Sequence, residues 1–183
     1  MSQTIAAVVD IRCSQADEHM NADGGVERIV VGVDGSANSI RALEWAIAVA
    51  RGNRAEILAV HAFRPGHGST AWSGDGKEAR RQAQISFEYN WCLPLTHAGL
   101  PYRAIFVDGN PVATLVATAV EQHADLIVVG ARGLGGFSEL LLGSVSQQLA
   151  SHTPVPLVLV PAAFKPLRSP ASRPGHPAST AVL

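Results

Sequence analysis

Five short apolar runs, rich in valine and isoleucine, alternate along the chain with longer segments that mix apolar and polar residues. Runs of this length and composition are typical of strands buried in a parallel sheet. They cover residues 28–33, 56–63, 102–107, 125–129 and 155–160. In the intervening segments apolar residues recur at helical spacing. The pattern predicts an α/β fold, a three-layer sandwich with a mostly parallel five-stranded sheet.

Local signals mark where the helices begin. Ser36 or Asn38 is the expected N-cap of the first helix, which ends at Gly52-Asn53. Asn110 and Pro111 suit the N-cap and first position of a later helix.

The second helix is expected from about Lys77 to Leu93. Its apolar stripe is predicted to be wide, including Ile85 and Tyr89, and Pro94 should end or kink it.

Both ends of the chain differ in composition from the middle. Residues 1–25 are expected to form a flexible extension, although the apolar patch 5–9 is also compatible with an added edge strand. Residues 163–183 are rich in proline and predict a disordered tail. A single domain is expected over residues 26–162, with a long loop between Arg64 and Lys77.

Composition excludes several classes of protein. The formal net charge is -1, and no lysine- or arginine-rich block suggests a nucleic acid or an anionic membrane as partner. Apolar runs are too short to cross a bilayer. Two distant cysteines, Cys13 and Cys92, and the lack of a signal-like N-terminus favour a reduced, cytoplasmic setting. No histidine spacing indicates a metal site, and the Gly-Lys pair at 76–77 lacks the Ser or Thr of a P-loop.

The strand at 125–129 leads into a glycine-rich loop that suits an anion. Glycines let the backbone approach a phosphate closely. The loop closes at Gly143-Ser144, where a helix is expected to begin with its free amides facing the loop. The same glycines could instead only relieve backbone strain.

The spacing Gly130-x2-Gly133-x9-Gly143-Ser144 resembles the ATP-binding signature of the universal stress protein family. Residues 29–36 resemble the opening strand and turn of that family, and residues 155–161 resemble its closing strand. The resemblance implies a Rossmann-like fold of the adenine nucleotide alpha hydrolase type, with strand order 3-2-1-4-5. The switch point would then bring Asp34 and the Gly130 loop to one crevice.

The resemblance also implies a set of residues that bind ATP, with or without Mg²⁺ or Mn²⁺. They are Gly32, Val33, Asp34, Ala62, Gly130, Arg132, Gly133, Gly143, Ser144 and Val145. The Gly130 loop would surround phosphates and ribose, and Gly32 would leave room for the base. Ala62 stands where the family usually has valine.

Two of these side chains have other interpretations from sequence, and the neighbouring His61 is interpreted separately. Asp34 could simply close an Asx turn or cap the next helix. Arg132 could be a solvated charge, although a phosphate partner suits its place between glycines. His61 is expected to be a strand-end residue satisfied by neighbouring polar groups, not a catalyst.

The resemblance favours a nucleotide-dependent regulatory module over an enzyme, because no general base beside a positioned water is recognisable. The edge strand Leu157–Val160 would pair with the same strand of a second copy to form a homodimer. An unknown regulatory protein would be the partner that responds to the nucleotide state. Two alternatives are a dimeric interaction protein with a vestigial site and an ATP-dependent adenylating enzyme. The latter would need a pyrophosphate loop that residues 33–36 do not supply.

Overall fold

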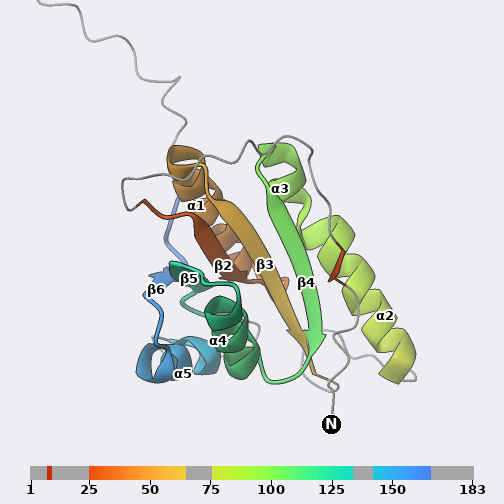
Figure 1. Cartoon of the computed structure of the whole chain (residues 1–183). Coiled ribbons are helices and arrows are strands. Elements are labelled where there is room, and N and C mark those ends of the chain that lie inside the picture. Colours follow the sequence, from red (N-terminus) through yellow and green to blue (C-terminus); the bar gives the residue numbers. More distant parts are fainter. Residues whose placement is uncertain (1–7, 10–24, 65–75, 134–141, 166–183) are drawn as a thin grey trace, which may run out of the picture.

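The computed structural model describes residues 8–9, 25–64, 76–133 and 142–165. Twelve elements follow one another in these ranges (Figure 1). The strands are β1 (Val8–Val9), β2 (Arg28–Gly32), β3 (Glu56–Phe63), β4 (Tyr102–Asp108), β5 (Leu126–Gly130) and β6 (Leu157–Val160). The helices are α1 (Ala37–Asn53), α2 (Gly76–Ser86), the π-helix η1 (Phe87–Trp91), α3 (Leu93–Ala98), α4 (Pro111–Glu121) and α5 (Ser144–His152).

The sheet has the predicted parallel arrangement. Its order is β1-β4-β3-β2-β5-β6, so the five long strands follow the order 3-2-1-4-5. Every pairing among those five is parallel. β1 is added antiparallel, with Val8 opposite Ile105 and Val9 opposite Ala104, so part of the N-terminal apolar patch forms an edge strand. The rest of that extension, the tail from 166 and most of the 64–77 loop lie outside the described residues.

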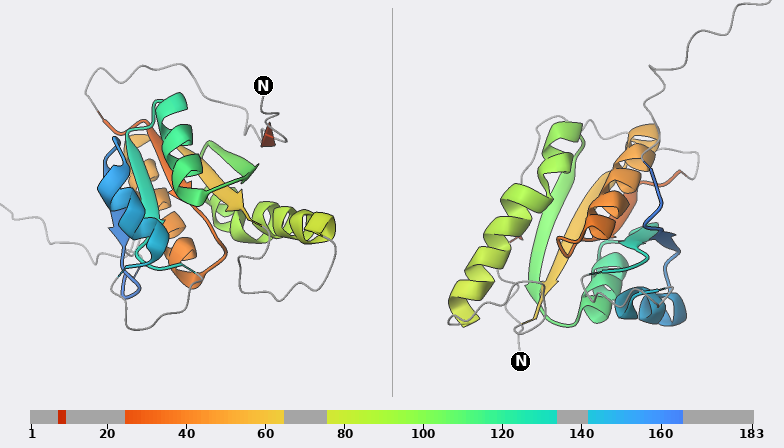
Figure 2. Two further views of the ribbon diagram at one scale, coloured as in Figure 1. Left: turned by 90° about the horizontal axis from the view of Figure 1, so that it is seen from below. Right: turned by 180° about the vertical axis from the view of Figure 1, so that it is seen from behind.

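Helices cover both faces of the sheet and create two cores. The core on one side includes buried residues of α1 and α3, such as Leu43 and Leu95. The core on the other side is formed with α4 and α5, through Leu115 and Leu149. The predicted three-layer sandwich is therefore confirmed (Figures 1 and 2).

The expected caps are formed where the structure describes them. Ser36, not Asn38, caps α1, because its Oγ accepts the Ser39 N–H at 3.1 Å. Asn110 caps α4 by accepting from the amides of Val112 and Ala113.

The second helical segment differs from the prediction. It changes to a π-helix at Phe87–Trp91 and ends at Cys92, close to the predicted end, and the separate helix α3 follows from Leu93 to Ala98. Pro94 is tolerated because it lies in the first turn of α3, where a missing N–H breaks no helical bond. The apolar stripe is also narrower than predicted: Ile85 is 37% exposed and Tyr89 71%. Figure 2 (left) shows α2 extending outward beyond the sheet, so α2 has little of the sheet to pack against, and none of its residues is buried.

Candidate functional site

The switch point of the sheet brings two loops together. β2 and β5 are parallel neighbours, with Val31 opposite Val128, so the segments that follow them leave from the same edge. The chain continues from β2 into α1 on one face of the sheet, while α5 packs with α4 on the other. The site predicted from sequence lies at this edge.

The turn after β2 is organised by Asp34. Its Oδ1 accepts the N–H of Ser36 at 3.0 Å, which closes an Asx turn. The Asp34 N–H donates to Ser39 Oγ at 3.3 Å, so the turn is also fixed to the first turn of α1. Gly35 has a φ of +80°, a conformation that side chains other than glycine rarely adopt. The local interpretation of Asp34 is thus correct.

The other carboxylate oxygen of Asp34 faces the glycine loop. A Cβ added to Gly133 would lie 2.6 Å from Asp34 Oδ2, so the carboxylate packs directly against the Gly133 backbone. Gly143 approaches the same place, since a Cβ there would lie 3.3 Å from the Gly133 nitrogen. Asp34, Gly133 and Gly143, which are far apart in sequence, therefore meet.

Three hydrogen bonds fix the two ends of the loop to each other and to the sheet. The Gly143 N–H donates to the Ala131 carbonyl at 2.8 Å. The Ser146 Oγ donates to the Gly130 carbonyl at 2.8 Å, and the Ala131 N–H donates to Val160 O at 2.8 Å. α5 begins at Ser144, with Gly143 at the N-cap and no side chain capping it. The first amides of α5 are therefore placed beside the contact between Asp34 and Gly133.

Two of the predicted glycines have a packing role. A Cβ on Gly130 would lie 2.8 Å from the backbone C and O of Asn38, so Gly130 allows α1 to approach β5 closely. A Cβ on Gly32 would lie 2.9 Å from Val129 Cγ1 and would also touch Leu115. The space beside Gly32 is filled by these side chains, and the expected contact of Gly32 with a base stays a prediction.

The remaining predicted residues are placed less directly. Val33 is buried and its N–H donates to Val60 O at 2.9 Å. Ala62 is half-buried on β3 opposite Val107, one strand away from the Asp34 turn. The Val145 side chain packs into the α4–α5 core, so only its backbone is available to a ligand.

Arg132 and Ser144 have the freedom that a ligand-binding residue needs. The half-buried Arg132 guanidinium makes no ion pair with the residues that the structure describes. Ser144 is exposed at the first position of α5.

His61 behaves as predicted and has further partners that sequence reasoning missed. Its Nδ1 lies 2.7 Å from the carbonyl oxygen of Val33. Burial is the main influence on the ring and lowers its pKa below 6.5, although the Val33 bond and the charge of Asp34 act in the opposite direction. Trp91 and Phe106 lie against the ring, with centroids 5.1 and 5.3 Å away. Nothing in the sequence indicated the contact of His61 with these two rings.

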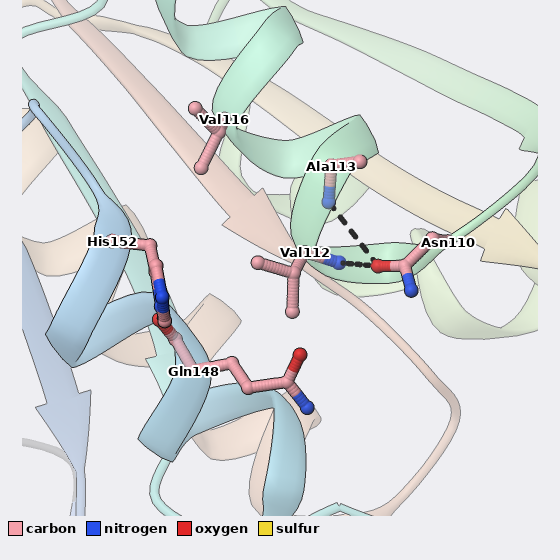
Figure 3. A pocket seen from close by; sticks show the side chains of 6 residues that line it. All are labelled: Asn110, Val112, Ala113, Val116, Gln148 and His152. Atoms are coloured by element: carbon pink, nitrogen blue, oxygen red, sulfur yellow. Dashed lines mark hydrogen bonds between the residues drawn. The ribbon is translucent and has the colours of Figure 1, made fainter.

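A second hollow, of about 390 Å³, lies between α4 and α5 (Figure 3). It is lined by Asn110, Val112, Ala113, Val116, Gln148 and His152. His152 Nδ1 lies 2.9 Å from the Gln148 carbonyl oxygen. None of the residues predicted to bind nucleotide lines this hollow, so it is separate from the site at the switch point.

In the described ranges, no helix has the length and apolar character required to cross a bilayer. The same ranges contain no cluster of three or more histidine, cysteine or acidic side chains able to hold a metal ion.

The fold and this site define a Rossmann-like α/β protein in which a glycine-rich loop meets an acidic turn at the switch point. Residues 25–161 match the universal stress protein family. A universal stress protein of Thermus aquaticus is 33% identical over 135 residues, covering 72% of this chain and 96% of that protein. One of Mycobacterium tuberculosis is 32% identical over 146 residues, covering 72% and 94%. The chain belongs to the universal stress protein family.

Solved structures agree with this assignment. A universal stress protein in complex with cAMP is 31% identical, with a TM-score of 0.52. The match covers 74% of this chain and 97% of that protein's chain. The universal stress protein of Archaeoglobus fulgidus in complex with dAMP has a TM-score of 0.56 at 22% identity, covering 73% and 97%. The second of these supports the fold alone.

Proposed function

We propose that this protein binds ATP at the switch point and acts as a nucleotide-dependent regulatory module in a stress response. The observation that carries the proposal is the close packing of Asp34 on Gly133, which in turn lies beside Gly143 at the start of α5. A related protein that is 31% identical was solved with cAMP, which supports an adenine nucleotide as the ligand class.

The residues fit such a ligand. Gly133 and Gly143 leave no Cβ between the backbone and a phosphate, and the first amides of α5 and the Ser144 hydroxyl can donate to it. Arg132 supplies a positive charge beside them. The Asp34 carboxylate lies against Gly133 and can accept a hydrogen bond from ribose or base.

A divalent ion would be a companion of the phosphates. Asp34 is the carboxylate that the described residues place at the site, so Mg²⁺ or Mn²⁺ would take its other ligands from phosphate and water. Because Asp34 already binds the Ser36 amide, it is poorly suited to act as a general base. We expect ATP hydrolysis to be slow at most.

Purification without added nucleotide tests the proposal first. One sample is denatured, and the released small molecule is identified by chromatography and mass spectrometry. A folded sample is titrated with ATP, ADP and cAMP in the presence of magnesium, and its thermal stability is measured. We expect a stoichiometric adenine nucleotide or a clear thermal shift with one of them. An empty site without any thermal shift would instead favour an interaction protein with a vestigial site.

A matched pair of variants localises the binding. Gly143→Asp places a carboxylate where a phosphate is expected and should weaken ATP binding by at least about 100-fold through charge repulsion. Gly76→Asp makes the same chemical change where an added Cβ meets nothing within 4 Å, and should bind as the parent does. If a folded Gly143→Asp protein bound ATP like the parent, the loop would not be the anion site.

The homodimer is part of the same proposal. β6 lies at one edge of the sheet, and its apolar residues Leu157–Val160 can extend the sheet antiparallel into a second copy. Light scattering after size-exclusion chromatography should give twice the monomer mass of 19.2 kDa. A monomer at micromolar concentration would contradict the dimer without affecting the nucleotide site.

A further inference from the structure

The turn that carries Asp34 is held by two ring side chains that come from other elements. His61 lies on β3 and contacts the residue before Asp34. Trp91 lies at the end of η1 and contacts the residue after it. Neither is among the residues expected to touch a nucleotide.

The contact of His61 is a directed hydrogen bond. Its Nδ1 is 2.7 Å from Val33 O, and because a carbonyl oxygen can only accept, Nδ1 must carry the hydrogen. The peptide oxygen immediately before Asp34 is therefore bound to β3. This bond fixes the direction in which the chain leaves β2.

The contact of Trp91 is a close packing interaction. A Cβ added to Gly35 would lie 2.5 Å from indole Cε2 and Cζ2, so the indole rests directly on the Gly35 Cα. With a φ of +80°, Gly35 adopts a conformation that a larger side chain would strain, and the indole removes the space as well. Two independent constraints thus require glycine next to Asp34.

The two rings support each other. Their centroids are 5.1 Å apart at 73°, an edge-to-face contact, and Phe87 lies 5.8 Å from His61. The π-helix determines where Trp91 lies: Cys92 N–H donates to Phe87 O at 3.0 Å, a bond across five residues. Such a turn rotates Trp91 away from the direction that a continuous α-helix would give it, and π-turns recur at functional sites.

We infer that His61 and Trp91 are positioning residues for the nucleotide site, which hold the Val33–Gly35 turn so that the Asp34 carboxylate meets Gly133. The inference rests on the proposed function, because it assigns the position of Asp34 to nucleotide binding. It also makes η1, which carries Trp91, part of the site. Affinity for the nucleotide is set partly by a helix that never touches it.

Paired variants test each contact. His61→Leu removes the donor and Trp91→Ala removes the indole, and each should weaken adenine nucleotide binding by about 10-fold. His61→Asn keeps an N–H near the position of Nδ1, and Trp91→Phe keeps a ring on Gly35, so both should stay within about threefold of the parent. Leu95→Ala changes a fully buried residue of α3 and is the control for lost stability. Its affinity for the nucleotide should also stay within about threefold of that of the parent.

Hydrogen exchange of the turn supplies a readout that does not need the ligand. In His61→Leu and Trp91→Ala the amides of the Val33–Ser39 peptide should exchange faster than in Leu95→Ala. If affinity fell equally in Leu95→Ala, or if His61→Asn failed to restore it, the two rings would act only through stability and the inference would be wrong.

The same experiments separate the two proposals. A parent protein that bound nucleotide, with unaltered binding in His61→Leu and Trp91→Ala, would overturn only the positioning role. A parent that bound no adenine nucleotide would overturn the proposed function. If the turn amides of His61→Leu and Trp91→Ala then also exchanged as in the parent, the conclusion that the two rings hold the turn would be wrong as well.

Discussion

The two ends of the sheet are closed in different ways. At the amino ends of the strands, Glu56 accepts from Arg28 Nε at 3.1 Å and from Arg103 Nε at 2.9 Å, and Arg103 also donates to Gln122 at 2.9 Å. Asp125 Oδ2 accepts two backbone amides at the start of β2. Charged side chains here bind each other and fix the register of β2, β3 and β4.

At the carboxyl ends of β2 and β5 the contacts involve glycine, backbone groups and single polar side chains such as Ser146. Gly133 packs on Asp34, and Gly143 binds Ala131. This arrangement leaves the backbone close to the surface and available to a ligand, whereas the amino end uses its polar groups internally. We expect from this comparison that the amino-end network contributes to stability alone, whereas the carboxyl end contributes to the packing of α1 and to the proposed binding. Variants at each end should separate the two contributions.

The largest effect is expected for Gly130→Ala. The new methyl would lie 2.8 Å from backbone atoms of Asn38, which cannot move without shifting α1, so the free energy of unfolding should fall by about 3 kcal/mol. Urea unfolding measures it. Gly52→Ala, where a Cβ meets nothing within 4 Å, should not destabilise the protein. Equal free energies of unfolding for the two variants would contradict the packing role of Gly130.

Breaking the amino-end network should have the next largest effect. Glu56→Gln leaves two guanidinium groups without their carboxylate, and the side chain is 27% exposed, so the cost should be about 2 kcal/mol in unfolding free energy. Nucleotide affinity should not change. Glu78→Gln, in an exposed pair with Arg81, is the control and should be neutral. Weakened nucleotide binding in Glu56→Gln would contradict the separation of the two ends.

Gly133→Ala should affect binding more than stability. A methyl at 2.6 Å from Asp34 Oδ2 displaces a side chain and not a backbone, so the fold should survive while ATP affinity falls about 10-fold, equivalent to about 1.4 kcal/mol. Calorimetric titration measures this, with Gly76→Ala as the control. Full affinity with a folded protein would show that the nucleotide does not need the observed position of Asp34.

The smallest effect is a pH dependence of stability that comes from His61. Because burial lowers its pKa below 6.5 in the folded protein, the unfolded chain binds more protons as the pH falls below that value. Stability should be complete near pH 7.5 and fall by up to about 1 kcal/mol towards pH 5.5. In His61→Asn this part of the pH dependence should disappear. Identical pH profiles for the parent and His61→Asn would show that the ring is not the responsible group.

Local signals explain what could be predicted from sequence. The strands, the caps at Ser36 and Asn110, and the neighbouring positions of β2 and β5 all depend on local residues or on topology. The dual use of Asp34 could not be derived, because Oδ2 meets Gly133 only after the sheet has formed.

Other features depend on long-range packing. The contact of Trp91 with Gly35 joins segments that sequence spacing cannot relate, and the π-helix that enables it has no local signal. Tyr89 is 71% exposed although Phe87 on the same π-helix is fully buried, and hydrophobic periodicity alone does not reveal which side of this segment packs on the core. Gly130 matched a binding motif, although its contact with Asn38 is a packing reason for the same residue.

The bonds from Gly143 to Ala131 and from Ser146 to Gly130 join both ends of the glycine loop to the end of β5. The sequence between Gly133 and Leu142 therefore starts and finishes at one fixed place. Insertions there should cost little loop-closure entropy and leave the amides of α5 unmoved. The two fixed ends are thus held by bonds that do not involve the sequence between them.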